Sequence, residues 1–226
     1  MVNKKCGSNE TITSQVVNYI RNQILVSKKY KKGDKIVESK IAEKFNISRA
    51  PVREALRRLE SHGLVTTIPR RGAFVSAFSV EEMEEIYGLR YLLEGSIYES
   101  LVKKELLKES DFSYLSWLID QMVKIARSEM TPDEKVLAFF KKDIEFHYFT
   151  WLKAERPRTM NILSDLYHQL ELGMLDDLSN EKNLEEAARN HYKILEFLKS
   201  GELEKLKESR SWSLFARRIE NIKSKG

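Results

Sequence analysis

Residues 47–75, ISRAPVREALRRLESHGLVTTIPRRGAFV, decide the fold of the N-terminal part of the chain. Ser48 is a favourable N-cap and Pro51 fits the first turn of a helix, so a helix is predicted to begin at about Ser48. At about 100° per residue, apolar residues fall on one face of this helix and arginines on the other. The apolar residues are Val52, Ala55, Leu56 and Leu59. The pattern therefore predicts a helix that buries one side and presents arginines on the other.

The residues on either side of this helix predict a winged helix-turn-helix. A His-Gly pair ends the helix, and the β-prone runs LVTT and AFVS then flank a turn that carries Arg70 and Arg71 at its tip. Upstream, residues 37–45 are predicted to form a short helix, joined to the arginine helix by a brief turn. Two helices joined by a short turn and followed by a hairpin are typical of a winged helix-turn-helix domain.

Periodicity alone leaves an alternative, because a solvated basic helix inside an ordinary α/β domain would show the same pattern. The run from Gly33 to Ser76 favours the first interpretation. It closely resembles the N-terminal DNA-binding domain of the GntR family of bacterial transcriptional regulators. The resemblance is nearly unbroken over more than forty positions and includes the core SRAPVREAL and the wing RRG.

The resemblance implies a DNA-binding role for the polar side of this domain. Arg53 and Arg49 would touch guanine edges, and Arg57 would contact the major groove and its phosphates. The wing would approach the DNA backbone or the minor groove. The residues expected in the interface are Ser39, Ser48, Arg49, Ala50, Arg53, Arg57, Arg70, Arg71 and Gly72.

The charge distribution supports a division of labour within the chain. Residues 1–78 contain 16 Lys and Arg against 6 Asp and Glu, a net +10, whereas residues 79–226 contain 23 against 28, a net −5. Only the first part is therefore suited to a polyanion such as double-stranded DNA. No apolar run of about 18 residues occurs, and the first ten residues lack the apolar region of a signal peptide, so we expect a cytoplasmic protein with no membrane partner.

The remaining sequence predicts helices only. Residues 1–10 are polar and are expected to be disordered, residues 11–78 form the winged helix-turn-helix domain, and residues 79–226 form a second domain. Ser79 begins a helix through a capping box, and further helices are predicted over about 110–130, 132–156, 159–175, 184–200 and 202–222. The fold class is thus mainly α, with a small β-hairpin wing and a C-terminal antiparallel bundle of about six helices.

Three polar residues share stripes with apolar residues on the predicted bundle helices. Asp143 and His147 lie one turn apart on one helix, and His191 lies on the inward stripe of a later helix. A buried carboxylate and two buried imidazoles need partners, and a divalent cation would satisfy all three. The alternative is that each is a hydrogen-bonded core residue.

A second resemblance bears on this choice. An all-helical body behind a GntR-type head is similar to the FCD effector-binding domain of the FadR subfamily, whose metal-binding members use an Asp-x-x-x-His pair and two later histidines. Asp143, His147 and His191 match three of these ligands, but Ser213 stands where the fourth would be. The resemblance therefore implies a divalent metal such as Zn, Ni or Mn, bound more weakly by three protein ligands.

Arg90 and Glu94 also lie on an inward stripe, one turn apart. An internal ion pair is one interpretation. The resemblance instead implies that Arg90 faces the effector, since a buried guanidinium suits a carboxylate. Arg90, Glu94 and Ser213 are accordingly the candidate effector-binding residues.

Together these features predict a regulator, not an enzyme, that binds a palindromic operator as a homodimer and responds to a small organic or sugar acid. Two other classes remain. A metal-dependent hydrolase would use Asp143, His147 and His191 around a catalytic ion, with Glu94 as its base. A sequence-indifferent architectural DNA-binding protein would explain the charge but not the buried polar residues.

Overall fold

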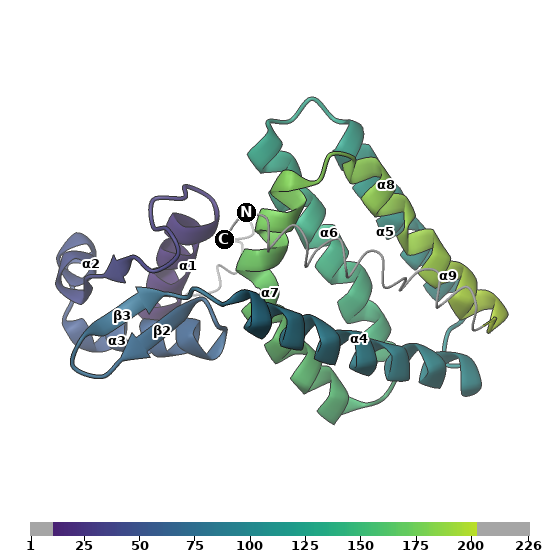
Figure 1. The fold of residues 1–226 in the computed structure, drawn as a ribbon, viewed down its shortest axis with the longest axis horizontal. Coiled ribbons are helices and arrows are strands. Elements are labelled where there is room, and N and C mark those ends of the chain that lie inside the picture. The colour runs from purple at the N-terminus through teal and green to yellow at the C-terminus, as the bar shows by residue number, and fades with distance from the viewer. Residues whose placement is uncertain (1–10, 203–226) are drawn as a thin grey trace, which may run out of the picture. The chain divides into compact units, whose positions relative to one another are not determined.

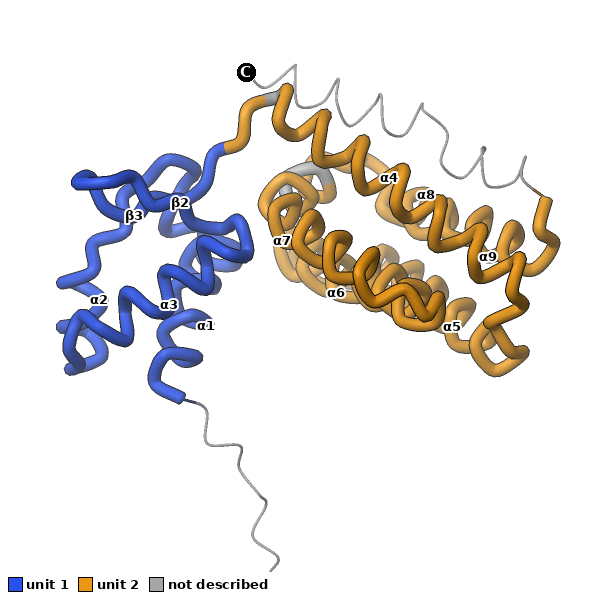
Figure 2. Tube along the Cα trace, turned by 90° about the horizontal axis from the view of Figure 1, so that it is seen from below, with its two compact units in different colours: residues 1–77 blue, residues 78–226 orange. Residues whose placement is uncertain are grey.

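The computed structural model describes residues 11–202, and the domain boundary lies between Ala77 and Phe78 (Figures 1 and 2). Each unit has its own core. The expected disordered N-terminus and the last predicted helix, residues 202–222, lie outside the described residues, apart from Glu202 itself. No helix in the described part of the chain is long and apolar enough to cross a membrane.

Three helices form the body of the N-terminal unit: α1 (Ile12–Leu25), α2 (Glu38–Phe45) and α3 (Arg49–Ser61). Helix α3 packs against both α1 and α2. The predicted apolar face of α3 is buried, and Val52, Ala55 and Leu59 are fully inaccessible to solvent. The apolar side of α1 supports it through Val16 and Ile20. The helix-turn-helix prediction is thus confirmed, and its stability comes from this apolar contact.

The turn between α2 and α3 depends on one left-handed residue. Asn46 has φ 52° and ψ 49°, and the backbone N–H groups of Asn46 and Ile47 return to the carbonyls of Glu43 and Ala42. Asparagine adopts this conformation more readily than most residues with a side chain. Ser48 is the N-cap residue of α3, as predicted, but its side chain makes no capping hydrogen bond.

The wing contains one strand more than the sequence predicts. Strands β2 (Val65–Ile68) and β3 (Gly72–Val75) form the expected hairpin, with Ile68 opposite Gly72. A third strand, β1 (Lys35–Ile36), pairs antiparallel with β3 and places Ile36 opposite Ala73. The sheet order is β1-β3-β2. A strand of two residues gives no usable alternation in the sequence, which is why the pattern missed it.

The C-terminal unit is helical throughout its described residues, as predicted. Its elements are α4 (Val80–Lys103), α5 (Glu109–Arg127), α6 (Pro132–Lys153), α7 (Pro157–Asn180), α8 (Leu184–Arg189) and α9 (His191–Ser200). Helix α6 packs against α4, α5 and α7, while α8 and α9 pack against α5 (Figure 1). The capping boxes at Ser79 and Thr131 are both present.

The structure corrects two sequence-based expectations. The helix predicted to end near residue 175 continues as α7 to Asn180. The helix predicted over 184–200 is divided at Asn190 into α8 and α9.

We predict that Asn46→Ala lowers the free energy of unfolding by about 1 kcal/mol, because alanine tolerates the left-handed conformation less well. Asn46→Gly is the matched control and should be close to neutral, since glycine adopts this conformation freely. Urea unfolding followed by circular dichroism measures both. An alanine variant as stable as the wild type would contradict this account of the turn.

Candidate functional site

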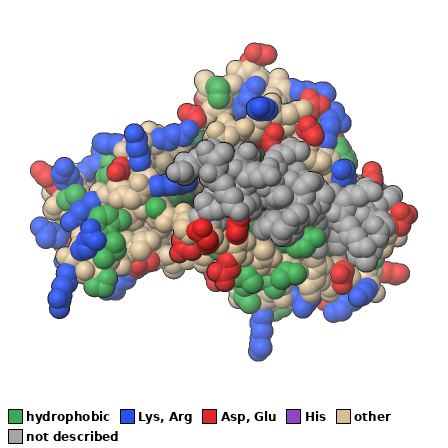
Figure 3. Space-filling model, viewed as in Figure 1, with side chains coloured by type: hydrophobic (Ala, Val, Ile, Leu, Met, Phe, Trp, Pro, Cys, Tyr) green, Lys and Arg blue, Asp and Glu red, His purple; other side chains and the backbone are tan. Residues whose placement is uncertain are grey.

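The exposed side of α3 carries the arginines that the sequence places there. Arg49, Arg53 and Arg57 are all exposed, and Val52 between them is buried. Ser39, Ser48 and Ala50 are exposed near the helix-turn-helix junction. Lys and Arg side chains stand out on the N-terminal unit in Figure 3. The geometry therefore offers a cationic helix face to a polyanion.

The wing extends this set of cationic groups. Arg70 and Arg71 are exposed at the β2–β3 turn, where Arg70 adopts a positive φ of 63°, and Gly72 follows with a φ of 102°. The Arg71 guanidinium and the Lys35 ammonium lie 5.8 and 5.9 Å from the centre of the Phe74 ring. These cation–π contacts hold two positive groups at the wing.

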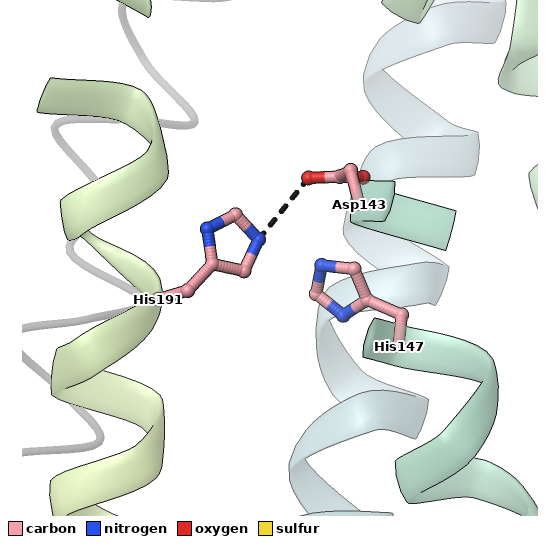
Figure 4. A group of neighbouring side chains, drawn as sticks. All are labelled: Asp143, His147 and His191. Carbon is pink, nitrogen blue, oxygen red and sulfur yellow. Dashed lines mark ion pairs between the residues drawn. The ribbon is translucent and has the colours of Figure 1, made fainter. Parts of the chain in front are cut away.

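The C-terminal unit brings together Asp143 and His147 from α6 and His191 from α9 (Figure 4). We call these residues the Asp-His-His cluster. All three are buried, and their candidate ligand atoms lie within 4.8 Å of one another. Within residues 11–202 this is the group of metal-ligating side chains that could hold a cation. The sequence prediction that these three residues converge is therefore matched by the geometry.

The surroundings of His191 define what its ring can do. Its Nδ1 lies 3.2 Å from the carbonyl oxygens of Ala187 and Ala188, which only accept hydrogen bonds, so Nδ1 carries a proton. Its Nε2 lies 3.1 Å from Asp143 Oδ1. In a neutral ring this arrangement would point the lone pair of Nε2 at a carboxylate oxygen. Either His191 is protonated or a cation is shared between the two atoms.

The Nδ1 atom of His147 is also engaged, in this case by two side chains of α4. It lies 3.0 Å from Glu94 Oε1 and 3.0 Å from the Tyr98 hydroxyl, both on α4. With Nδ1 engaged by the Tyr98 hydroxyl and the Glu94 carboxylate, Nε2 is the ring nitrogen left to bind a cation. A carboxylate behind a histidine is a common support for a metal ligand, because it fixes the tautomer and makes the ring a better donor.

Arg90 completes the chain of charged groups behind the cluster. Its Nε lies 3.3 Å from Glu94 Oε2, and its guanidinium carbon lies 4.5 Å from the centre of the Tyr167 ring. Both Arg90 and Glu94 are buried. The internal ion pair that the sequence allowed is therefore present.

Tyr167, on α7, supports the carboxylate of the cluster. Its hydroxyl donates a hydrogen bond to Asp143 Oδ2. Burial alone would raise the pKa of the Asp143 carboxyl, but the His191 hydrogen bond and the electrostatic effect of His147, His191 and Arg90 lower that pKa below its usual range. Burial and the nearby Asp143 raise the pKa of Tyr167 well above that of a free tyrosine. Asp143 therefore stays ionised and Tyr167 stays a donor.

Two buried residues that contact the cluster, Tyr98 and Tyr167, were not predicted from the sequence. Tyr98 lies one turn after Glu94, so the spacing that found the ligands could also have found it. Tyr167 and Glu171 lie one turn apart on α7, where no polar residue had been assigned inward. Ser213, the residue at the expected fourth ligand position, lies outside the described residues.

A divalent cation fits the donor set of the cluster. The separation of 3.1 Å between Asp143 Oδ1 and His191 Nε2 is close to that of two neighbouring ligands that each lie about 2.1 Å from one ion. A carboxylate oxygen and two imidazole nitrogens suit Zn, Ni or Mn. The hydrogen bonds that support these three side chains leave the metal-binding atom of each one facing the other two.

Two family descriptions cover most of the chain. Residues 12–75 match "Bacterial regulatory proteins, gntR family", and residues 85–210, more than half of the chain, match the FCD domain. The Escherichia coli protein McbR/YncC has a solved structure similar in fold, with a TM-score of 0.68 and 22% identity over 93% of this chain and 94% of that one.

Curated relatives agree with this assignment. The HTH-type transcriptional regulator YdhC of Bacillus subtilis is 25% identical over 79% of this chain and 77% of its own length. The gluconate operon transcriptional repressor of Bacillus subtilis is 34% identical over 58% of this chain and 51% of its own length. Because such relatives are transcriptional regulators, the hydrolase alternative is wrong, and the prediction of a non-enzymatic protein is confirmed. The chain belongs to the GntR family of bacterial transcriptional regulators, and its C-terminal unit is an FCD domain.

Proposed function

We propose that this regulator is a repressor that binds a specific operator sequence and whose operator affinity is set by a small organic or sugar acid. The observation that carries the proposal is the pairing of an exposed arginine helix, α3, with a buried and supported Asp-His-His cluster in the second unit. The repressor role draws on the gluconate operon repressors among its relatives.

In the DNA-binding step, α3 enters the major groove and the wing approaches the adjacent backbone or minor groove. Arg53 and Arg49 read guanine edges, and Arg57, Arg70 and Arg71 add phosphate or groove contacts. Ser39, Ser48, Ala50 and Gly72 lie where the backbone must come close to the DNA. The division of charge along the sequence supports this assignment, because the positive excess is confined to the N-terminal unit.

In the sensing step, Asp143, His147 and His191 would hold a divalent cation, which would supply a coordination position for an effector carboxylate. Glu94 and Tyr98 orient His147, and Tyr167 orients Asp143. Arg90 adds a second positive group close to the cluster, and Ser213, which lies outside the described residues, is the further candidate effector-binding residue. The effector must bind one arrangement of the protein better than the other to alter DNA affinity.

We further propose that the protein acts in the cytoplasm as a homodimer on a palindromic operator, since two heads related by a two-fold axis match such a site. The C-terminal unit exposes several large apolar residues, including Leu89 and Leu92 on α4 and Ile162 on α7, which supports association of two chains. Light scattering should give twice the mass of one chain.

We predict that Arg53→Ala sharply lowers the preference of the protein for its operator, a binding site selected with the wild-type protein from a random duplex library. A bidentate arginine–guanine contact discriminates against other bases by about 1–3 kcal/mol, whereas non-specific binding depends on the summed positive charge. Fluorescence anisotropy with the operator and with an unrelated duplex at one salt concentration measures both affinities. Arg58→Ala is the matched control, because Arg58 is held by Glu54 at 2.6 Å on the same helix. If the wild type does not prefer its operator, the protein is an architectural binder.

We predict that protein purified without a histidine tag or chelator contains about one divalent metal ion per chain and that His191→Ala loses it. His168→Ala is the control, because His168 is the other histidine of the helical unit and lies outside the cluster. Glu94→Gln should retain the site but weaken metal affinity by about 10- to 100-fold, since it removes the support of His147. Elemental analysis and competition with a fluorescent chelator measure these effects. An unchanged metal content in His191→Ala would remove the cluster as the site.

A further inference from the structure

One arginine of α3 is already held in place in the DNA-free protein. Arg53 Nε donates a hydrogen bond to Glu38 Oε2 at 3.0 Å, which joins α3 to α2. Arg49 and Arg57, on the same exposed face, make no hydrogen bond or ion pair with any residue between 11 and 202. The residue expected to read a guanine is thus the one whose guanidinium has a fixed neighbour.

The position of Glu38 is itself well defined. Glu38 is the first residue of α2, where the positive end of the helix dipole favours a carboxylate. Two residues earlier, Ile36 pairs with Ala73 in the wing sheet. The carboxylate that holds Arg53 is therefore tied through β1 to the wing, and through its own helix to the turn at Asn46.

The contact leaves the end of the guanidinium available. Only Nε of Arg53 is engaged within the described residues, so both terminal nitrogens keep their donors. A bidentate contact to O6 and N7 of guanine needs two such donors in one plane. We propose that Glu38 is a positioning residue for specificity, which presents the terminal nitrogens of Arg53 to a guanine in the operator. This inference rests on the DNA-binding function proposed above.

Stability does not account for this pair. The Arg53 and Glu38 side chains are 60% and 31% exposed, and exposed ion pairs contribute little to folding. A carboxylate near DNA also repels phosphates and lowers affinity for every sequence. The benefit of the pair is discrimination between base sequences. An arginine that is already held loses less side-chain freedom when it binds guanine, and it is restrained from turning toward a phosphate.

The proposal predicts opposite changes for two kinds of DNA. Binding sites are first selected from a random duplex library with the wild-type protein. The guanine that Arg53 reads is the one whose replacement weakens binding of the wild type but not of Arg53→Ala. Affinities are then measured for the selected duplex, for the same duplex with that guanine replaced, and for an unrelated duplex. In Glu38→Gln, discrimination at that guanine should fall about 10-fold, while affinity for the unrelated duplex should rise about 2- to 3-fold. Glu54→Gln, which releases Arg58 on the same helix, should raise affinity without loss of discrimination.

A double-mutant cycle separates positioning from direct contact. If Glu38 acts through Arg53, Glu38→Gln should not reduce discrimination further in an Arg53→Ala background. Equal discrimination by wild type and Glu38→Gln would overturn the inference, and so would a loss at a different base pair, which would mean that Glu38 reads a cytosine itself. A wild type that selects no sequence would overturn the proposed function and this inference with it.

Discussion

The contact between Asp143 and His191 organises the C-terminal unit. It joins α6 to α9 through a carboxylate oxygen and an imidazole nitrogen 3.1 Å apart, both buried. The cost of removing these groups from water is large, and it is offset only when each has its partners. The surrounding residues supply them: backbone carbonyls hold the far side of His191, and Tyr167 holds the other oxygen of Asp143. The remaining carboxylate oxygen and imidazole nitrogen atoms can then act as ligands of a cation.

The charged groups behind the cluster form a continuous chain across three helices. Arg90 contacts Glu94 on α4, Glu94 contacts His147 on α6, and Tyr167 on α7 touches both Arg90 and Asp143. Such a network is rigid when every member is satisfied and costly when one is missing. A ligand that changes the charge at the cluster therefore acts on helices that are already linked to one another. This is the physical basis for assigning sensing to this unit.

The charged groups of the N-terminal unit are exposed, whereas those of the C-terminal cluster are buried and paired. Its stability comes from apolar contacts of α3 with α1 and α2, while Arg49 and Arg57 remain in solvent without protein partners among the described residues. Those side chains keep their charge and their donors for an external polyanion. Arg53 differs because α2 supplies a carboxylate for it, so the position of its guanidinium depends on how the two helices are joined at Asn46.

Strong periodic signals made much of this predictable from sequence. The apolar stripe of α3 and the spacing of Asp143 and His147 each follow from the helical repeat. Strand β1 was missed because two residues carry no pattern, and the division between α8 and α9 was missed because no proline or glycine marks Asn190. Tyr98 and Tyr167 were missed because an aromatic ring on an inward stripe reads as core, and only the structure shows that their hydroxyls reach His147 and Asp143.

Anomalous X-ray diffraction tests the central claim, that a divalent cation completes the Asp-His-His cluster. Crystals of protein purified without chelators would be measured on both sides of the zinc, nickel and manganese absorption edges. The account predicts an anomalous peak about 2.0–2.2 Å from Asp143 Oδ1 and the Nε2 atoms of His147 and His191. No peak at any edge, with Asp143 and His191 still in direct contact, would contradict it and leave a protonated His191 as the partner of Asp143.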